Sequence, residues 1–150
     1  MSIDTATGEI RDDAPDLALV PLHIAELDEE ALASLFPTPQ QAVGALIIAR
    51  ERLREAPAVL QQRSSDLKQA KRRLIVAQGM SFVALRREGR TIADARAERD
   101  VAPEVQRAQE QVDTCDLALE YAREVRRTLE VEISMLQTLV RYLTGEHHRG

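Results

Sequence analysis

The sequence predicts an all-α protein: a long antiparallel helical hairpin or coiled coil with short N-terminal helices, in an oligomeric state. Aromatic residues make up only 3% of the 150 residues, while Ala, Leu, Val, Arg and Glu dominate, a composition typical of long helices. Between Val101 and Leu143, apolar residues recur at alternating steps of four and three, which keeps one face of a helix toward a partner helix. No period-two run and no Asn-Gly or Asp-Gly turn indicates a β-hairpin.

The chain is expected to hold one helical coiled-coil assembly domain, residues 28–144, between two disordered ends. Residues 1–27 are predicted to be an acidic leader, because their first part combines low hydrophobicity with clustered acids. Residues 145–150 are predicted to be a tail, with Gly145 ending the last helix. We expect a cytoplasmic protein without a membrane span, because the N-terminus lacks a secretory signal and no window approaches about 18 consecutive apolar residues.

Capping residues mark the first two helix starts. Asp28 is predicted to cap a short helix over 29–36. Thr38 is predicted to cap the next helix, with Pro39 at its first position and Gln41 completing a capping box.

Proline and glycine divide the rest of the chain. The second helix is expected to end shortly before Pro57, which either begins a new helix or kinks a continuing one. Gly89 is predicted to stop the following segment. Thr91 then caps a short charged helix over 92–100, and Pro103 begins the long helix that carries the 3.5-residue repeat.

The repeat on the long helix is the predicted oligomer interface. A lone hairpin with so few aromatic residues buries little surface, so we expect a homo-oligomer. Arg126 is the one interruption: either it specifies register and oligomer state, or its guanidinium extends past the edge of the interface. The predicted interface residues are Val112, Cys115, Leu119, Arg126, Leu129, Ile133, Leu136, Val140 and Leu143.

The net charge of −5 conceals a division along the chain. Residues 1–48 carry one basic and nine acidic residues, residues 49–90 carry eleven and four, and residues 91–150 carry eight and twelve. The middle third is therefore a candidate surface for a polyanion. Eighteen of the twenty cations are Arg, which suits bidentate contacts with phosphate, although a GC-rich coding sequence would also favour Arg codons.

Basic residues in this middle third recur at helical spacing. Three pairs, each offset from the last by 18 residues, or five turns, are predicted to form one stripe that binds phosphates without reading sequence. The alternative is that the stripe pairs with the acidic face of residues 104–132, in its own or a neighbouring subunit. The predicted nucleic-acid-binding residues are Arg50, Arg54, Lys68, Lys71, Arg72, Arg86, Arg87 and Arg90.

Motifs for catalysis, phosphate-binding loops, and paired Cys or His at metal spacing are not found in the sequence. Cys115 has no helix-spaced His partner, so it is predicted to be a small apolar residue of the repeat. We therefore predict no catalytic residues, no metal, no cofactor and no enzymatic activity.

A basic helix, the turn Gly89-Arg90-Thr91, a charged stretch with Arg96 and Arg99, and a long terminal helix follow one another over residues 42–143. This order resembles the UvsY-like recombination mediators of phages. The resemblance implies single-stranded DNA binding, ring-like homo-oligomers, and a recombinase or a single-strand-binding protein as partner, in a bacterial host cell. The acidic leader, the preference for Arg over Lys and the scarcity of aromatic residues depart from that family.

Two functions from different classes follow from these patterns. The first is a non-enzymatic, single-stranded-DNA-associated accessory protein of recombination, acting as a homo-oligomer. The second is a structural or adaptor coiled coil that assembles proteins without nucleic acid.

Overall fold

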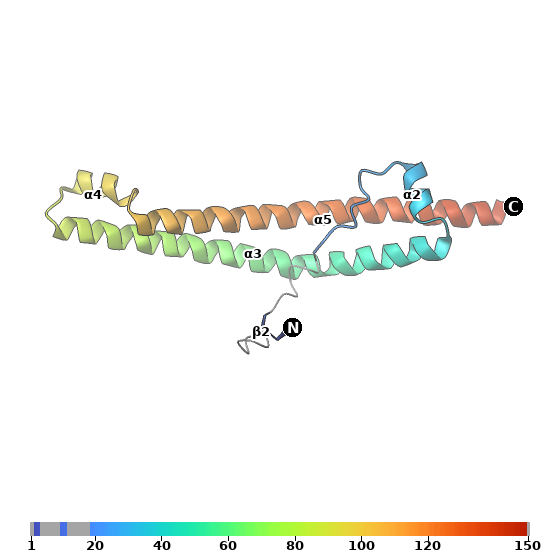
Figure 1. The fold of residues 1–150 in the computed structure, drawn as a ribbon, viewed down its shortest axis with the longest axis horizontal. Helices are drawn as coiled ribbons and strands as arrows, with labels where there is room; N and C mark the ends of the chain where they lie inside the picture. Colours follow the sequence, from blue (N-terminus) through green and yellow to red (C-terminus); the bar gives the residue numbers. More distant parts are fainter. Residues whose placement is uncertain (1, 4–9, 12–18, 150) are drawn as a thin grey trace. The chain divides into compact units, whose positions relative to one another are not determined.

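The computed structural model describes residues 2–3, 10–11 and 19–149, with side chains from 19 to 145. Its helices are α2 (Glu29–Leu35), α3 (Pro39–Arg87), α4 (Ile92–Arg99) and α5 (Pro103–Arg149), shown in Figure 1. Two short strands, β1 (Ser2–Ile3) and β2 (Ile10–Arg11), pair antiparallel. The predicted all-α class is confirmed, and strands of two residues are too short to leave a period-two pattern in the sequence.

The chain divides into two compact units, where a single assembly domain over 28–144 had been predicted. Unit 1 comprises Met1–Val59 and Ala122–Gly150, and unit 2 comprises Leu60–Tyr121. Both long helices contribute to both units, so chain continuity alone could not reveal this division. For the predicted disordered leader, residues 1, 4–9 and 12–18 lie outside the described residues.

The predicted starts of α2 and α3 are confirmed by their hydrogen bonds. The Asp28 carboxylate accepts a bond from the N–H of Ala31 at 2.7 Å. The Thr38 hydroxyl accepts from the N–H of Gln41 at 3.3 Å, and the Gln41 side chain accepts from the N–H of Thr38 at 3.4 Å. This reciprocal pair is the capping box read from the sequence.

Of the two alternatives at Pro57, the structure shows a continuing helix: α3 runs through the proline, so the expected helix end shortly before it is wrong and no new helix begins there. A proline inside a helix removes one backbone hydrogen bond and costs about 3 kcal/mol. Its neighbours Ala56 and Val59 are buried in unit 1, whereas Pro57 itself is exposed. Burial of these neighbours helps to offset the lost hydrogen bond.

The turn between α3 and α4 follows the prediction. Gly89 has a φ of 89°, a left-handed conformation that glycine adopts without strain. The N–H groups of Gly89 and Arg90 donate to the carbonyls of Arg86 and Leu85, at 3.1 and 3.2 Å, which is the Schellman arrangement at a helix end. Thr91 caps α4 through its hydroxyl.

Gly145 does not end the last helix, because α5 continues to Arg149. Gly89 is the described glycine with a positive φ, whereas Gly145 keeps a helical backbone. A glycine ends a helix only when the following chain turns away, and no such turn follows Gly145 within α5.

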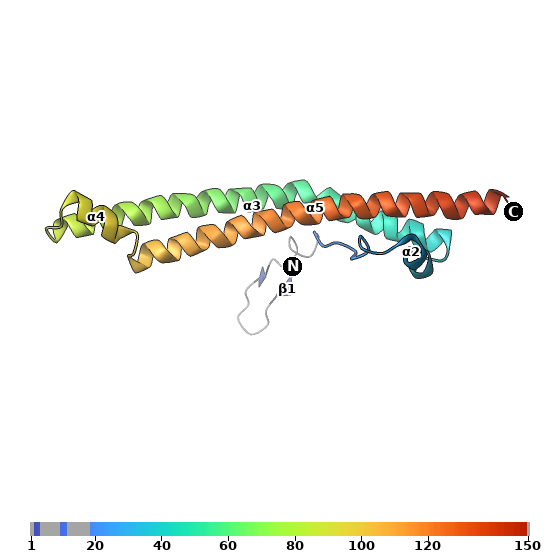
Figure 2. The same ribbon diagram turned by 90° about the horizontal axis from the view of Figure 1, so that it is seen from above.

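The two units differ in how many of their described side chains are buried. Figure 2 shows α3 and α5, the two long helices that contribute residues to both units. The buried apolar residues of unit 1 are Leu19, Ile24, Leu32, Ala42, Ala45, Leu46, Ala49, Ala56, Val59, Ala122, Val125, Leu129, Leu136 and Leu139. Those of unit 2 are Ala70, Ala95, Val105, Val112 and Leu119.

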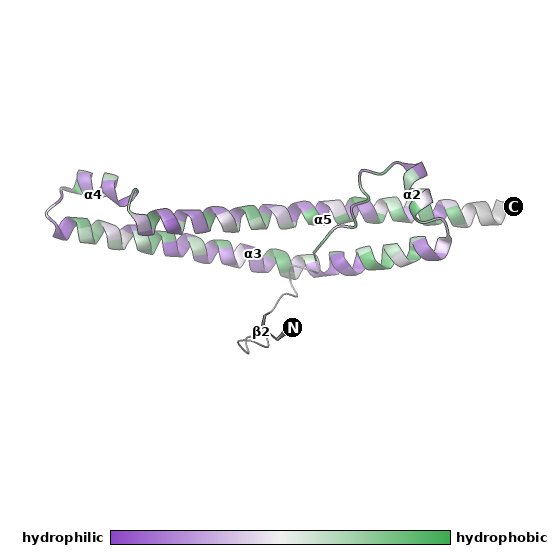
Figure 3. Ribbon diagram, viewed as in Figure 1, coloured by the Kyte–Doolittle hydropathy of each residue, from purple (hydrophilic) through white to green (hydrophobic). Residues whose placement is uncertain are grey.

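Hydrophilic and hydrophobic residues are interspersed along both long helices, as Figure 3 shows. Within the described residues, no single helix has the length and apolar character needed to cross a bilayer. Only α2 and α3 taken together, bent by 100° at their junction, meet that criterion.

Candidate nucleic-acid interface and other functional residues

Unit 2 carries a cationic face on α3, formed by Lys68, Lys71, Arg72 and Arg86. At 3.6 residues per turn these four positions fall within about 100° of the helix circumference and span roughly 27 Å. All four side chains are exposed. Because the α3 portion of unit 2, residues 60–87, holds seven basic residues and one acidic residue, the local potential is positive.

No acid of the described chain forms an ion pair with any of the four side chains of the cationic face. The Arg86 guanidinium donates a hydrogen bond to the carbonyl of Arg90 at 2.7 Å, across the end of α3, and keeps its charge at the surface. Lys68, Lys71 and Arg72 are therefore available to an external anion.

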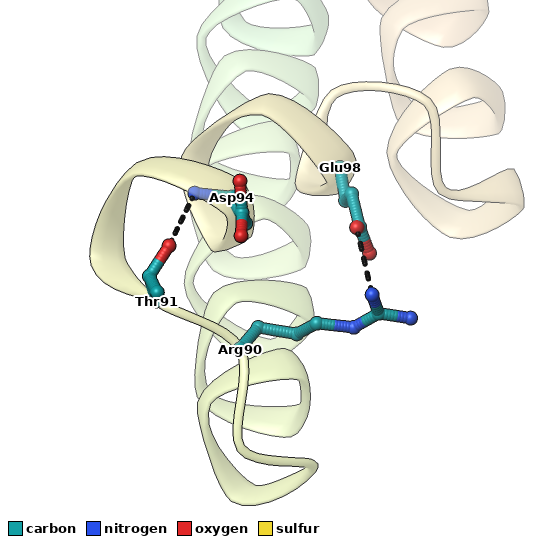
Figure 4. Close-up of polar contacts among 4 residues, drawn as sticks. All are labelled: Arg90, Thr91, Asp94 and Glu98. Carbon is teal, nitrogen blue, oxygen red and sulfur yellow. Dashed lines mark hydrogen bonds and ion pairs between the residues drawn. The ribbon is translucent and has the colours of Figure 1, made fainter.

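Four further predicted binding residues lie elsewhere. Arg90 is exposed, but its guanidinium pairs with Glu98 of α4 at 3.3 Å, beside the Thr91 cap (Figure 4). Arg87 is exposed about 100° around α3 from Arg86. Arg50 and Arg54 are exposed and belong to unit 1.

The structure changes the register of the predicted interface on α5. In unit 2, Val112 and Leu119 are buried and Cys115 is half-buried, as the repeat predicts. In unit 1, one predicted row is kept, with Leu129 and Leu136 at 0% exposure and Leu143 half-buried.

In unit 1, the second row of predicted interface residues is replaced by the row one residue earlier in the chain. Arg126, Ile133 and Val140 were predicted to face a partner, but they are half-buried, and the fully covered row is Val125, Glu132 and Leu139. Two successive steps of three, 119 to 122 and 122 to 125, produce this shift, which is a known irregularity of 3.5-residue repeats. Leu129 and Leu136 are covered by unit 1 itself and present no exposed surface to another chain.

Arg126 lies beside the buried row and not within it. Its Nε lies 4.0 Å from a carboxylate oxygen of Glu130, one turn along α5, and its side chain is 43% exposed. Val125 occupies the buried position that the predicted register assigned to Arg126. Arg126 therefore interrupts the repeat only in the predicted register, because in the observed register Val125 occupies the corresponding position.

Glu132 is a buried charged residue that the sequence analysis did not single out. It is 0% exposed, in unit 1. Its two carboxylate oxygens accept hydrogen bonds from the N–H groups of Leu22 at 2.9 Å and Ile24 at 3.0 Å. His23, between these donors, has a φ of 61°, a left-handed conformation that is uncommon outside glycine. Successive N–H groups around a left-handed residue form an anion-binding concavity, and Glu132 fills it.

The segment 19–24, called the strap below, is attached to both long helices of unit 1. Besides its bonds to Glu132, the strap accepts hydrogen bonds from the Arg52 guanidinium at the carbonyls of Val20, 3.1 Å, and Pro21, 3.3 Å. Leu19 and Ile24 are buried. The strap is thus part of the packed structure of unit 1, although the sequence assigned it to a disordered leader.

A signal for the strap was present in the sequence. A charged residue in a buried row of a helix requires a hydrogen-bonding partner, because an unpaired buried carboxylate is costly. The prediction instead continued the repeat through Arg126, Ile133 and Val140, which left Glu132 outside the row. The identity of the partner, 108 to 110 residues away, is not encoded in any local pattern.

The Cys115 thiol and the Glu124 carboxylate form their polar contacts with residues close to them in the chain. Among residues whose side chains are described, no group of three or more His, Cys, Asp or Glu side chains is arranged to hold a metal ion. Cys115 is a half-buried free thiol whose sulfur lies 3.7 Å from the Gln111 amide nitrogen. On the acidic side of α5, Glu124 pairs with Arg127 at 3.2 Å.

Comparison with known proteins adds no relative to these observations. No protein-family model matches the chain, and no curated protein and no solved structure shows significant similarity to it.

Proposed function

We propose that this protein is a non-enzymatic accessory protein of recombination that binds single-stranded DNA and acts as a homo-oligomer. The observation that carries the proposal is the cationic face of unit 2, which is exposed and forms no ion pair with a described residue. Such a face attracts phosphates without reading sequence. The role in recombination rests on the resemblance to phage mediators alone.

The cationic face suits a flexible single strand. A face roughly 27 Å long tracks several nucleotides. Ile75, which is 67% exposed, and Phe82, which is half-buried, lie on the same side of α3 and offer apolar contacts for unstacked bases. A rigid duplex keeps its bases stacked inside and could not use these contacts.

Fluorescence anisotropy with a labelled mixed-sequence single strand tests the proposal, at low and high salt. The double variant Lys68→Glu, Lys71→Glu reverses two charges of the cationic face. We expect wild-type affinity to fall steeply with salt, and the variant to lose about tenfold or more. Its slope of log affinity against log salt should also fall by about 1.4, because each lost phosphate contact contributes about 0.7 for a single strand.

A matched control changes the net charge equally in unit 1. The double variant Arg50→Glu, Arg54→Glu should weaken binding much less than the unit 2 variant. Equal losses from both variants would mean that net charge, not the cationic face, governs binding. No binding of the wild type at low salt would overturn the proposal.

A second candidate function is a structural or adaptor protein that assembles without nucleic acid. Exposed aliphatic side chains in unit 2 favour it: Ile75, Val76, Met80 and Val83 lie within three turns of α3 and are 48–70% exposed. Clustered exposed apolar residues mark contact sites for other proteins.

A further inference from the structure

A second face of α3 in unit 2 has the spacing of a helix-packing seam. Arg73, Val76, Met80, Val83 and Arg87 follow one another at steps of three, four, three and four, and all five are exposed. Val76 is 58% exposed, Met80 70% and Val83 48%. We call this set the basic–apolar stripe, because its apolar centre has a cation at each end. A groove of about 640 Å3 lies beside its first part, at Arg73, Val76 and Met80, and Glu104 of α5 also lines this groove.

The α5 portion of unit 2 carries a face of opposite charge. Glu110, Asp113, Leu117, Glu120 and Tyr121 fall within about 100° of the helix circumference, and all five are exposed. Leu117 is 66% exposed and Tyr121 64%. We call this set the acidic–apolar stripe. It lies well around α5 from the buried row that contains Val112 and Leu119, so packing within unit 2 leaves it uncovered.

The charges of the two stripes are complementary. The α3 portion of unit 2 has seven basic residues and one acidic residue, whereas residues 103–121 of α5 have one basic residue and five acidic residues. On the basic–apolar stripe, no ion pair with a described residue is formed by Arg73 or Arg87. The same holds for Glu110 and Glu120 on the acidic–apolar stripe. The fold of unit 2 thus places the stripes on different helices, α3 and α5, and leaves these four charges without an ion-pair partner among the described residues.

We propose that the basic–apolar stripe of one copy of the chain docks the acidic–apolar stripe of a second copy. The cations at the ends of the first stripe would then face carboxylates, and the apolar centres would cover each other. Tyr121 of the docking copy is the anchor, because a tyrosine that fills a groove dominates the energy of many interfaces. The groove that receives it is lined by Arg73, Val76, Ala77 and Met80, among others.

The charges of the stripes also disfavour contacts between two stripes of the same kind. Two basic–apolar stripes packed together would bring Arg73 and Arg87 close to cations of the second copy, and two acidic–apolar stripes would oppose carboxylates. Like charges across an interface cost several kcal/mol and exclude such pairings. The contact therefore joins two different surfaces and leaves one stripe free on each outer copy. Contacts of this type extend into a ring or an open filament.

The docking deepens the homo-oligomer part of the proposed function and rests on it, but it does not depend on nucleic-acid binding. Lys68, Lys71 and Arg86 lie on the cationic face and outside both stripes. The Lys68→Glu, Lys71→Glu variant should therefore assemble like the wild type even though it has lost affinity for DNA. Failure of the DNA-binding proposal would appear only in anisotropy, and failure of the docking proposal only in the assembly state.

Sedimentation velocity of the full-length protein, without nucleic acid and over a range of concentrations, tests the docking. We expect the wild type to assemble beyond a dimer, and to do so less at high salt, because exposed charge pairs are screened. Met80→Glu, which disables the basic–apolar stripe, and Leu117→Glu, which disables the acidic–apolar stripe by placing a carboxylate in its apolar centre, should each be monomeric. Both positions are exposed, and unchanged helical circular dichroism would show that the variants fold.

Mixing the two variants gives the sharpest result. Each retains the stripe that the other lacks, so an equimolar mixture should form a 1:1 dimer that cannot extend. Val131→Glu changes an exposed apolar residue of unit 1, 50% exposed, and should assemble like the wild type. A monomeric wild type, a mixture that stays monomeric, or an equal loss of assembly in Val131→Glu would overturn the proposal.

Discussion

Unit 1 and unit 2 contribute similar lengths of described chain, yet fourteen apolar side chains are buried in the first and five in the second. Unit 1 gains its core from three sources: the two long helices, α2, and the strap. In unit 2 the long helices supply four of the five buried side chains, and α4 supplies Ala95. Eleven of the fourteen side chains in unit 1 lie on α3 and α5, and the strap and α2 add Leu19, Ile24 and Leu32, so additional chain segments enlarge a core that the long helices already form.

The uncovered surface of unit 2 has a corresponding role. Its two stripes and its cationic face all lie on helical surfaces that no strap or additional helix covers. A helix pair of this kind buries one side of each helix and leaves the other sides exposed. We therefore expect substitutions in unit 1 to change stability, and substitutions on the exposed faces of unit 2 to change binding and assembly.

The largest expected effect on stability is at Leu129, which is 0% exposed in unit 1. Leu129→Ala should lower the free energy of unfolding by about 2–5 kcal/mol, because it leaves a cavity in a packed core. Leu117→Ala makes the same chemical change at an exposed position of unit 2 and should alter that free energy by less than about 0.5 kcal/mol. Urea unfolding followed by circular dichroism measures both. Similar losses would contradict the division of roles.

Glu132→Gln should have the next largest effect, about 1–3 kcal/mol. The substitution places an amide NH2 against one of the backbone N–H donors of Leu22 and Ile24, so one buried donor loses its acceptor. Hydrogen exchange measured by NMR should show faster exchange at these two amides. Glu130→Gln is the matched control, because Glu130 is exposed and its closest ion-pair distance is 4.0 Å. Equal changes in stability and in amide exchange for the two variants would show that the Glu132 carboxylate does not hold the strap.

Arg52→Gln should cost about 1 kcal/mol of stability, because the guanidinium that donates to the carbonyls of Val20 and Pro21 is lost. Protease sensitivity of the strap should rise in this variant. Arg54→Gln removes an exposed guanidinium two residues away and should leave proteolysis unchanged. An unchanged cleavage pattern in Arg52→Gln would show that Glu132 and the buried apolar residues suffice to hold the strap.

The smallest effects are expected at two glycines of unit 2, and they have opposite signs. Gly89→Ala forces a side chain onto a φ of 89° and should destabilise by about 1 kcal/mol. Gly79→Ala lies inside α3, where an added Cβ meets no atom within 4 Å, and should stabilise by about 0.5–1 kcal/mol. Thermal unfolding of both variants would show the difference. A loss of stability in Gly79→Ala would mean that α3 needs glycine there for another reason.

The features that could be read from the sequence are those made by residues close together in the chain. Asp28, Thr38, Gly89 and Thr91 each satisfy backbone groups within five residues, so their hydrogen bonds form wherever that local sequence is helical. The cationic face could be predicted for the same reason, because helical spacing alone places its members on one side. None of its four members forms an ion pair with a described residue, and only Arg86 donates a hydrogen bond, to the carbonyl of Arg90.

The candidate site could be predicted only in part. Helical periodicity does not reveal that Arg90 pairs with Glu98, because that pair depends on how α4 folds back at the turn. Nor does it separate Arg50 and Arg54 from the unit 2 cations, since the division into units depends on contacts between distant segments. The two stripes of unit 2 could not be predicted from the sequence, because their residues have the same helical spacing as a buried row. Only their exposure in the structure distinguishes them from a buried row.

The helical class, the helix starts and the turn at Gly89 follow from the amino-acid sequence alone, because each depends on residues a few positions apart. The continuation of α3 through Pro57, the register of α5 in unit 1 and the place of the strap depend on tertiary contacts. Each of these is set by packing or hydrogen bonding with a distant segment. Glu132 shows the reason most directly: its partners lie more than one hundred residues earlier in the chain, and the free energy of satisfying its buried carboxylate exists only once the fold has formed.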